Sequence, residues 1–166
     1  MTPDAFCDEL RPRLVGSLVL FCGDRWLAEE IAQEALARAV ERWGRVGAMA
    51  SPQAWTYRTA FNLARSTARR RAAERRARSR LAGDRPPDLP DTSTAVAVRA
   101  AVAALPSRQR AAIVARFYAG LPVTETAEAL GCAEGTVRAL TAQAMVRLRT
   151  SGLLDEEEED LDAHPA

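Results

Sequence analysis

One proline-rich stretch interrupts a sequence that is otherwise helical in pattern, and it constrains the fold more than any other feature. Residues 83–91 contain three prolines and a glycine, which cannot continue a helix. On both sides alanine, leucine, arginine and glutamate prevail, and no run of alternating β-branched residues occurs. The sequence therefore predicts an all-α fold, with two small helical domains joined by an extended linker.

The breaks and helix signals also predict the boundaries of the domains. We expect an N-terminal domain at 1–80, the linker at 81–94, a C-terminal domain at 95–150 and an acidic disordered tail at 151–166. Helices are expected over 3–22, where Pro12 divides or kinks the helix, and over 25–43 and 52–80. In the second domain we expect helices from Pro106 to about 119, then over 123–130 and 133–149, which is a helix-turn-helix spacing.

The basic residues exclude much enzyme chemistry. All 23 of them are arginine, so the chain has no lysine for a P-loop or a Schiff base. The single histidine, His164, lies three residues from the end in a polar segment and is a poor base for a catalytic triad. We therefore expect neither enzymatic activity nor a cofactor.

The cysteines and the apolar runs point to no metal site and no membrane. Cys7, Cys22 and Cys132 lack C-x-x-C spacing, and packing explains them better than a metal or redox role. The longest apolar run, at 18–22, is too short to cross a bilayer and no signal-peptide pattern precedes it. We expect a cytoplasmic protein that does not insert into membranes.

The net charge of +1 hides two blocks of opposite sign. Residues 65–80 hold eight arginines against the single Glu74, and residues 155–162 hold seven carboxylates and no base. The first block predicts a surface that binds a polyanion. The second is either a solvated end or a competitor that screens the arginines from DNA.

The predicted helix over 25–43 carries a row of carboxylates opposite its apolar face. Glu30, Glu34 and Glu41 lie at i, i+4 and i+11, and like charges at this spacing repel each other in an isolated helix. A basic partner would relieve the repulsion. A solvated face remains the alternative for these residues.

The next helix combines aromatic, amide and guanidinium groups on one stripe. Trp55, Asn62 and Arg69 share this stripe with Thr59 and Ser66. Aromatic side chains stack on unpaired bases while arginines hold phosphates, so the pattern is typical of a surface for opened single-stranded DNA. The alternative is that Trp55 belongs to the core, which is the interpretation we prefer for Phe61.

Residues 120–138 match a helix-turn-helix pattern. Ala127, Leu130 and Val137 are the expected packing positions. The second helix would present its first turn to the major groove through Glu134, Gly135, Thr136 and Arg138.

Together these segments resemble the extracytoplasmic-function (ECF) sigma factors of the sigma-70 family. The resemblance covers about residues 10–149 and is most specific at 28–34, which is similar to the family's polymerase-clamp-binding helix. The pattern Trp55-x-Tyr57-Arg58-x-Ala60-x-Asn62 is similar to its promoter-melting segment. Ordinary repressors contain neither segment.

The resemblance implies partners and residue roles. Core RNA polymerase would be bound through its largest-subunit clamp helices by Glu30, Gln33, Glu34 and Glu41, and through its beta flap by the C-terminal domain. Promoter DNA would be held at the minus-ten element by Trp55, Tyr57, Arg58, Asn62, Arg65, Arg69 and Arg70, with one base flipped from the stack. The linker would enter the polymerase cleft, and an anti-sigma factor is a further candidate partner.

The recognition helix departs from the family pattern. Where the family has a serine cap and several basic residues, this chain has Ala133 and then Leu140, Gln143 and Met145. A missing cap costs about 1 kcal/mol of helix stability. We therefore expect weak binding of the minus-thirty-five element, or help from an activator or the flap.

Two other classes compete with this interpretation. A stand-alone regulator of the LuxR type would explain residues 105–149 but not the acidic row or the segment from Trp55 to Asn62. An enzyme on a helical scaffold would need a nucleophile, a base or metal ligands in a recognisable arrangement, and the sequence offers none.

Overall fold

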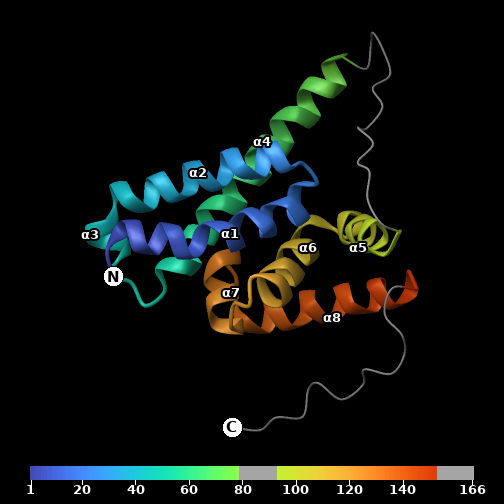
Figure 1. Ribbon diagram of the computed structural model, residues 1–166. Helices are drawn as coiled ribbons and strands as arrows, with labels where there is room; N and C mark the ends of the chain where they lie inside the picture. Colours follow the sequence, from blue (N-terminus) through green and yellow to red (C-terminus); the bar gives the residue numbers. More distant parts are fainter. Residues whose placement is uncertain (79–92, 153–166) are drawn as a thin grey trace, which may run out of the picture.

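The computed structural model describes residues 1–78 and 93–152, and there it confirms the all-α prediction, because these residues form helices and no strand (Figure 1). The first unit contains four helices and the second contains four helices and a π-helical turn. Nearly all of the predicted linker and acidic tail lie outside the described residues.

Side-chain caps explain where the helices of the first unit begin. Helix α1 (Pro3–Cys22) begins after Thr2, whose hydroxyl accepts from the Ala5 N–H at 3.3 Å, and ends at Gly23, which has a φ of 72°. Helix α4 (Pro52–Arg78) begins after Ser51, whose hydroxyl accepts from the Ala54 N–H at 3.0 Å. The helix α1 is not divided at Pro12.

The second predicted helix is shorter than expected. Helix α2 (Arg25–Glu41) starts at the cap Asp24 and ends at Arg42, where the backbone leaves helical geometry. A separate short helix, α3 (Trp43–Val46), follows. The Trp43 ring packs on Phe6 with the ring centroids 5.0 Å apart, which ties α3 to the start of α1.

The second unit contains the predicted helix-turn-helix. Helix α5 (Ser93–Ala104) precedes α6 (Ser107–Ile113), which continues into a π-helical turn, η1 (Val114–Tyr118). The helices α7 (Val123–Leu130) and α8 (Glu134–Thr150) are joined by Gly131, whose φ of 64° only glycine adopts readily. The helix expected from Pro106 to about residue 119 thus ends in a wider turn.

The two units pack against each other. Their buried apolar side chains form one cluster, which includes Leu14, Phe61, Leu121 and Val137. Helix α7 lies along α4, while α5 and η1 lie against α1. In Figure 1 the C-terminal half of α4 projects beyond the bundle, so its side chains have little tertiary support.

Candidate nucleic-acid interface

The outer face of α4 carries a polar strip beside a tryptophan. Asn62 and Ser66 are exposed, and Trp55 is half-buried with part of its ring against the core. The Asn62 Oδ1 atom accepts from Arg65 Nη2 at 3.2 Å, so the amide nitrogen is the group that can donate to a ligand. The strip therefore holds a hydrogen-bond donor and an aromatic ring that packs partly against the core on one face of α4.

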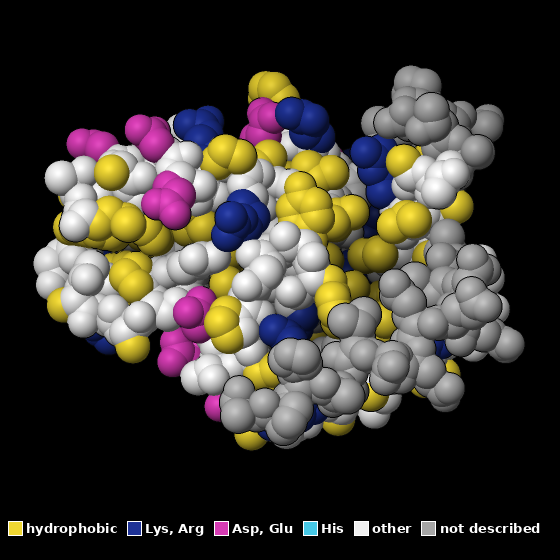
Figure 2. Space-filling model, turned by 60° about the horizontal axis from the view of Figure 1, so that its bottom comes forward, with side chains coloured by type: hydrophobic (Ala, Val, Ile, Leu, Met, Phe, Trp, Pro, Cys, Tyr) yellow, Lys and Arg dark blue, Asp and Glu magenta, His cyan; other side chains and the backbone are white. Residues whose placement is uncertain are grey.

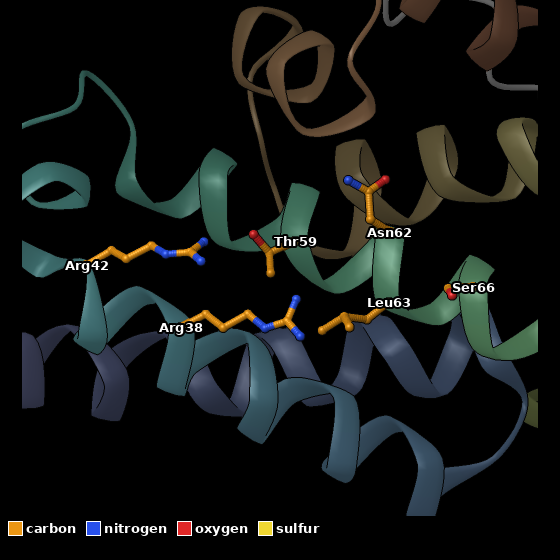
Figure 3. A pocket seen from close by; sticks show the side chains of 6 residues that line it. All are labelled: Arg38, Arg42, Thr59, Asn62, Leu63 and Ser66. Carbon is orange, nitrogen blue, oxygen red and sulfur yellow. The ribbon is translucent and has the colours of Figure 1, made fainter.

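A pocket lies between α2 and α4 along one edge of this strip. Two arginines, Arg38 and Arg42, line it together with Thr59, Asn62, Leu63 and Ser66. Figure 3 shows the Arg42 side chain reaching toward Thr59 and the Arg38 side chain reaching toward Leu63, whereas the Asn62 amide points away from both arginines. The pocket has a volume of about 310 Å³, which lies at the lower end of the usual range for small-ligand pockets. Its cations and hydroxyls suit a phosphate or the edge of a base.

Sequence reasoning missed Arg38 and Arg42. In the sequence, the helix expected over 25–43 shows a row of carboxylates and an apolar face, and the two arginines lie between them. Their spacing of four residues places them on one side of α2. The spacing of the two arginines was visible in the sequence, but only the packing of α2 on α4 shows that their side chains reach toward Thr59 and Leu63 (Figure 3).

The structure does not bring Tyr57 to this surface. Its side chain is fully buried, and its hydroxyl lies 3.1 Å from Ser17 Oγ. The Ser17 hydroxyl donates to the Arg13 carbonyl at 2.8 Å, so Tyr57 donates to Ser17. Burial raises the pKa of Tyr57 above its ordinary value. In this arrangement Tyr57 joins α4 to α1 inside the bundle.

Arginines flank the strip on its other edge and along the rest of α4. Burial, together with the charges of Arg108 and Arg69, lowers the pKa of Arg65, so a bound anion would relieve unfavourable interactions there. Arg69 and Arg70 are exposed on the projecting half of α4. Arg71 instead pairs with Asp24 at 3.3 Å.

The acidic row of α2 is exposed, but it is partly neutralised within its own helix. The Glu34 carboxylate pairs with Arg38 Nε at 2.8 Å, and Glu29 pairs with Arg25 at 3.2 Å. Glu30, Gln33 and Glu41 are exposed. A partner of opposite charge would therefore contact an acidic row in which Arg38 already neutralises the Glu34 carboxylate.

The first turn of α8 holds the residues predicted for the major groove. Glu134 accepts from Thr124 Oγ1 at 3.2 Å and pairs with Arg138 at 3.3 Å. Ala133 occupies the N-cap position and provides no side-chain hydrogen bond, as the sequence predicts. Thr136 is half-buried, and a Cβ at Gly135 would meet nothing within 4 Å. The turn is open to a ligand, but its Arg138 is already paired with Glu134.

Within 1–78 and 93–152, no cluster of three or more histidine, cysteine or acidic side chains is placed to hold a metal ion. None of the helices in those ranges has the length and apolar character needed to span a membrane.

The fold is that of an all-helical protein whose second unit contains a helix-turn-helix. Residues 6–74 match the family of sigma-70 region 2, and residues 95–148 match that of sigma-70 region 4. The chain is 33% identical over 121 residues to the ECF RNA polymerase sigma factor SigM of Mycobacterium tuberculosis, covering 73% of this chain and 62% of that protein. It is 31% identical over 140 residues to the RNA polymerase sigma-E factor of Streptomyces antibioticus, covering 82% of this chain and 74% of that protein. The chain belongs to the ECF sigma factors of the sigma-70 family.

A solved structure has the same fold. The sigma factor RpoE of Bartonella quintana, crystallised with the anti-sigma factor NepR, superposes with a TM-score of 0.74. The superposition covers 91% of this chain and 98% of that chain, at 22% sequence identity. The region 2 match also removes the support for a LuxR-type regulator, which left the N-terminal half unexplained.

Proposed function

We propose that this chain binds core RNA polymerase, directs it to specific promoters and helps to melt the minus-ten element. The observation that carries the proposal is the face of α4, where Trp55 and Asn62 lie beside the arginine-lined pocket. We assign polymerase binding and minus-ten recognition to residues 1–80 and minus-thirty-five recognition to 95–150, joined by 81–94. The family matches over 6–74 and 95–148 support this division.

Capture of a separated strand follows from the chemistry of this face. A base stacked on Trp55 contributes about 1 to 3 kcal/mol, regardless of its identity. A base turned out of the stack fits the pocket in size, where Asn62 donates a hydrogen bond and Arg42 meets the phosphate. Arg58, Arg65, Arg69 and Arg70 hold the flanking backbone in this proposal. Tyr57 is left out because its side chain is buried.

Polymerase binding is assigned to the exposed acidic side of α2. Glu30, Gln33 and Glu41 contact the clamp helices of the largest subunit, and Glu34 joins them once Arg38 turns toward DNA. The substitution Glu30→Arg is expected to reduce binding to core polymerase at least about tenfold, as loss of a charged interface contact does. The matched control is Glu9→Arg, an exposed charge reversal on α1.

The helix-turn-helix is assigned a weak role at the minus-thirty-five element. Glu134 is already bonded to Thr124 and Arg138, and the helix start has no side-chain cap. Contact with the beta flap would supply the affinity that the first turn of α8 lacks. Tight sequence-specific binding by the second unit in isolation would contradict this assignment.

Run-off transcription with purified core polymerase tests the proposal as a whole. Transcripts that depend on this chain, and that fall with Trp55→Ala and Glu30→Arg but not with Glu9→Arg, are the expected result. Failure of the chain to bind core polymerase would overturn it. In this proposal transcription initiation takes place in the cytoplasm, and the chain acts without a cofactor and without catalysis of its own. An anti-sigma factor is a further partner, as NepR is for RpoE.

A further inference from the structure

A hydrogen bond inside the second unit fixes the orientation of one amide group on α8. Gln143 of α8 is exposed, whereas Gln109 of α6 is buried, with only 8% of its surface accessible. The Gln109 Nε2 atom donates to the Gln143 Oε1 atom at 3.2 Å. Because the oxygen and the nitrogen of an amide point in different directions, the Gln143 NH2 group is left to point away from α6.

Packing alone does not explain a glutamine at position 109. The Gln109 Oε1 atom is buried and has no hydrogen-bond partner within residues 1–78 and 93–152. An unsatisfied buried amide oxygen destabilises a protein. An apolar side chain of similar size would fill the space between α6 and α8, which lie side by side, without that cost (Figure 1). The bond to Gln143 is therefore what distinguishes glutamine from an apolar residue here.

Gln143 lies on an exposed stripe of α8. Gly135 and Ala139 precede it at intervals of four residues, Arg147 follows at the same interval, and all four residues are exposed. The small side chains at 135 and 139 let the edge of a base pair approach α8 closely. The helix rises about 12 Å from Gly135 to Gln143, which is about the width of the major groove. Gln143 is thus the first long polar side chain on this stripe.

The surface around α8 is not continuously basic. Figure 2 brings forward the face that lies at the bottom of Figure 1, where α8 runs, and outside the grey residues its arginine side chains are scattered among uncharged ones. Arg138, near the start of α8, is paired with Glu134 at 3.3 Å. An uncharged polar group is therefore left to discriminate between bases, and Gln143 is placed to do so.

We propose that Gln143 is a specificity-determining residue, and that Gln109 restricts it to donating hydrogen bonds, so that it selects guanine over adenine at one position of the minus-thirty-five element. In the major groove guanine presents two acceptors, N7 and O6, whereas adenine presents the N7 acceptor beside the N6 donor. An unrestrained glutamine pairs with adenine through both its Oε1 and its Nε2 atoms. Gln143 does not, because its Oε1 atom is turned to Gln109. This inference rests on the proposed function, which assigns the element to the second unit.

The substitution Gln109→Met tests the restriction directly. Methionine fills a similar volume without the Nε2 donor, and it also removes the unsatisfied oxygen, so we expect the fold to be retained. The Gln143 amide can then turn, and adenine should gain on guanine by at least about fivefold, as expected for a new bidentate pair. Gln109 is buried and does not reach DNA, so a purely structural role would change stability and leave the base preference unchanged.

Two substitutions of Gln143 locate the base and reverse its choice. Gln143→Ala should abolish the preference for guanine at a single position of the element. Gln143→Glu keeps the bond from Gln109 but presents a second acceptor oxygen to the groove, so cytosine, whose N4 atom donates, should become the preferred base there. Thr150→Ala is the matched control, because Thr150 is exposed on the same face of α8 two turns further on.

The measurement is run-off transcription by purified core polymerase with the full chain. Each position of the minus-thirty-five element is changed in turn to all four bases. The wild type and Thr150→Ala should favour guanine over adenine at one position by at least about fivefold. Circular dichroism checks the fold of Gln109→Met; if it is unfolded, Gln143→Glu, an exposed substitution, still tests the direction of hydrogen bonding.

The outcomes separate this inference from the proposed function. A preference for adenine in the wild type, or a guanine preference that a folded Gln109→Met or Gln143→Glu leaves unchanged, overturns the inference. Transcription that depends on the chain but ignores every base of the element also overturns it, and leaves polymerase binding and minus-ten melting standing. The absence of any transcript that depends on the chain overturns the proposed function itself.

Discussion

The substitution Ala133→Ser should stabilise α8 by about 1 kcal/mol. Ala133 has the extended backbone of an N-cap residue, with φ of −74° and ψ of 154°, but its side chain cannot accept a hydrogen bond. A serine there would accept from the N–H of Gly135 or Thr136 without a change of backbone, and Ser in place of Ala at an N-cap contributes about 0.5 to 2 kcal/mol. The Thr136 N–H already donates to the Ala133 carbonyl at 3.0 Å, which favours the middle of that range over its upper end.

Urea denaturation followed by circular dichroism measures this gain. With a slope of about 2 kcal/mol per molar urea, Ala133→Ser should raise the midpoint by roughly 0.5 M, and thermal unfolding should shift upward by about 2 to 4 °C. The control is Ala139→Ser, exposed inside α8, where serine lowers helix propensity by up to about 0.5 kcal/mol and the midpoint should fall. An unchanged or lower midpoint for Ala133→Ser would refute the assignment of residue 133 as an uncapped N-cap.

Three further predictions concern the first unit. Asp24→Ala removes the 3.1 Å bond to the Leu27 N–H and should cost about 1 kcal/mol in urea denaturation, whereas Asp24→Asn, which keeps an acceptor, should cost less. Burial raises the pKa of Cys22 from 9.0 to about 11, so as the pH rises the thiol loses its proton in the unfolded chain before it does so in the folded one. The contribution of Cys22 to the free energy of unfolding should therefore be complete below pH 9 and fall toward pH 11. An equally steep fall in Cys22→Ala would contradict this. Arg42→Ala should lower promoter-complex formation and reduce the dependence of log K on log salt by about one, with helix content unchanged by circular dichroism.

Local signals were enough to predict most of the helices. Asp24 and Ser51-Pro52 mark helix starts, and Gly131 marks the turn, because each acts on its own backbone neighbours. The predicted helix over 25–43 was wrong at its end, where Arg42 leaves helical geometry and α3 begins. The sequence also did not predict the π-helical turn η1, because its residues would fit an ordinary α-helix in an isolated chain.

The candidate site was predictable only as a set of surfaces. Trp55, Asn62 and Arg69 share a stripe by periodicity alone, but the burial of Tyr57 depends on where α1 packs. The contribution of Arg38 to the pocket likewise depends on the approach of α2 to α4. The contact between the units joins residues far apart in the sequence, such as Gly16 and Tyr118, and no local pattern encodes it.

The projecting half of α4, which the proposed function places on DNA, carries an excess of positive charge. Arg71 and Arg75 lie four residues apart and Arg75 and Arg78 lie three apart, so like charges repel along a stretch with little packing to offset them. Salt should therefore strengthen this helix end by screening the repulsion. A bound phosphate backbone should do the same, so order in this segment, followed by hydrogen exchange, would report when the promoter is occupied.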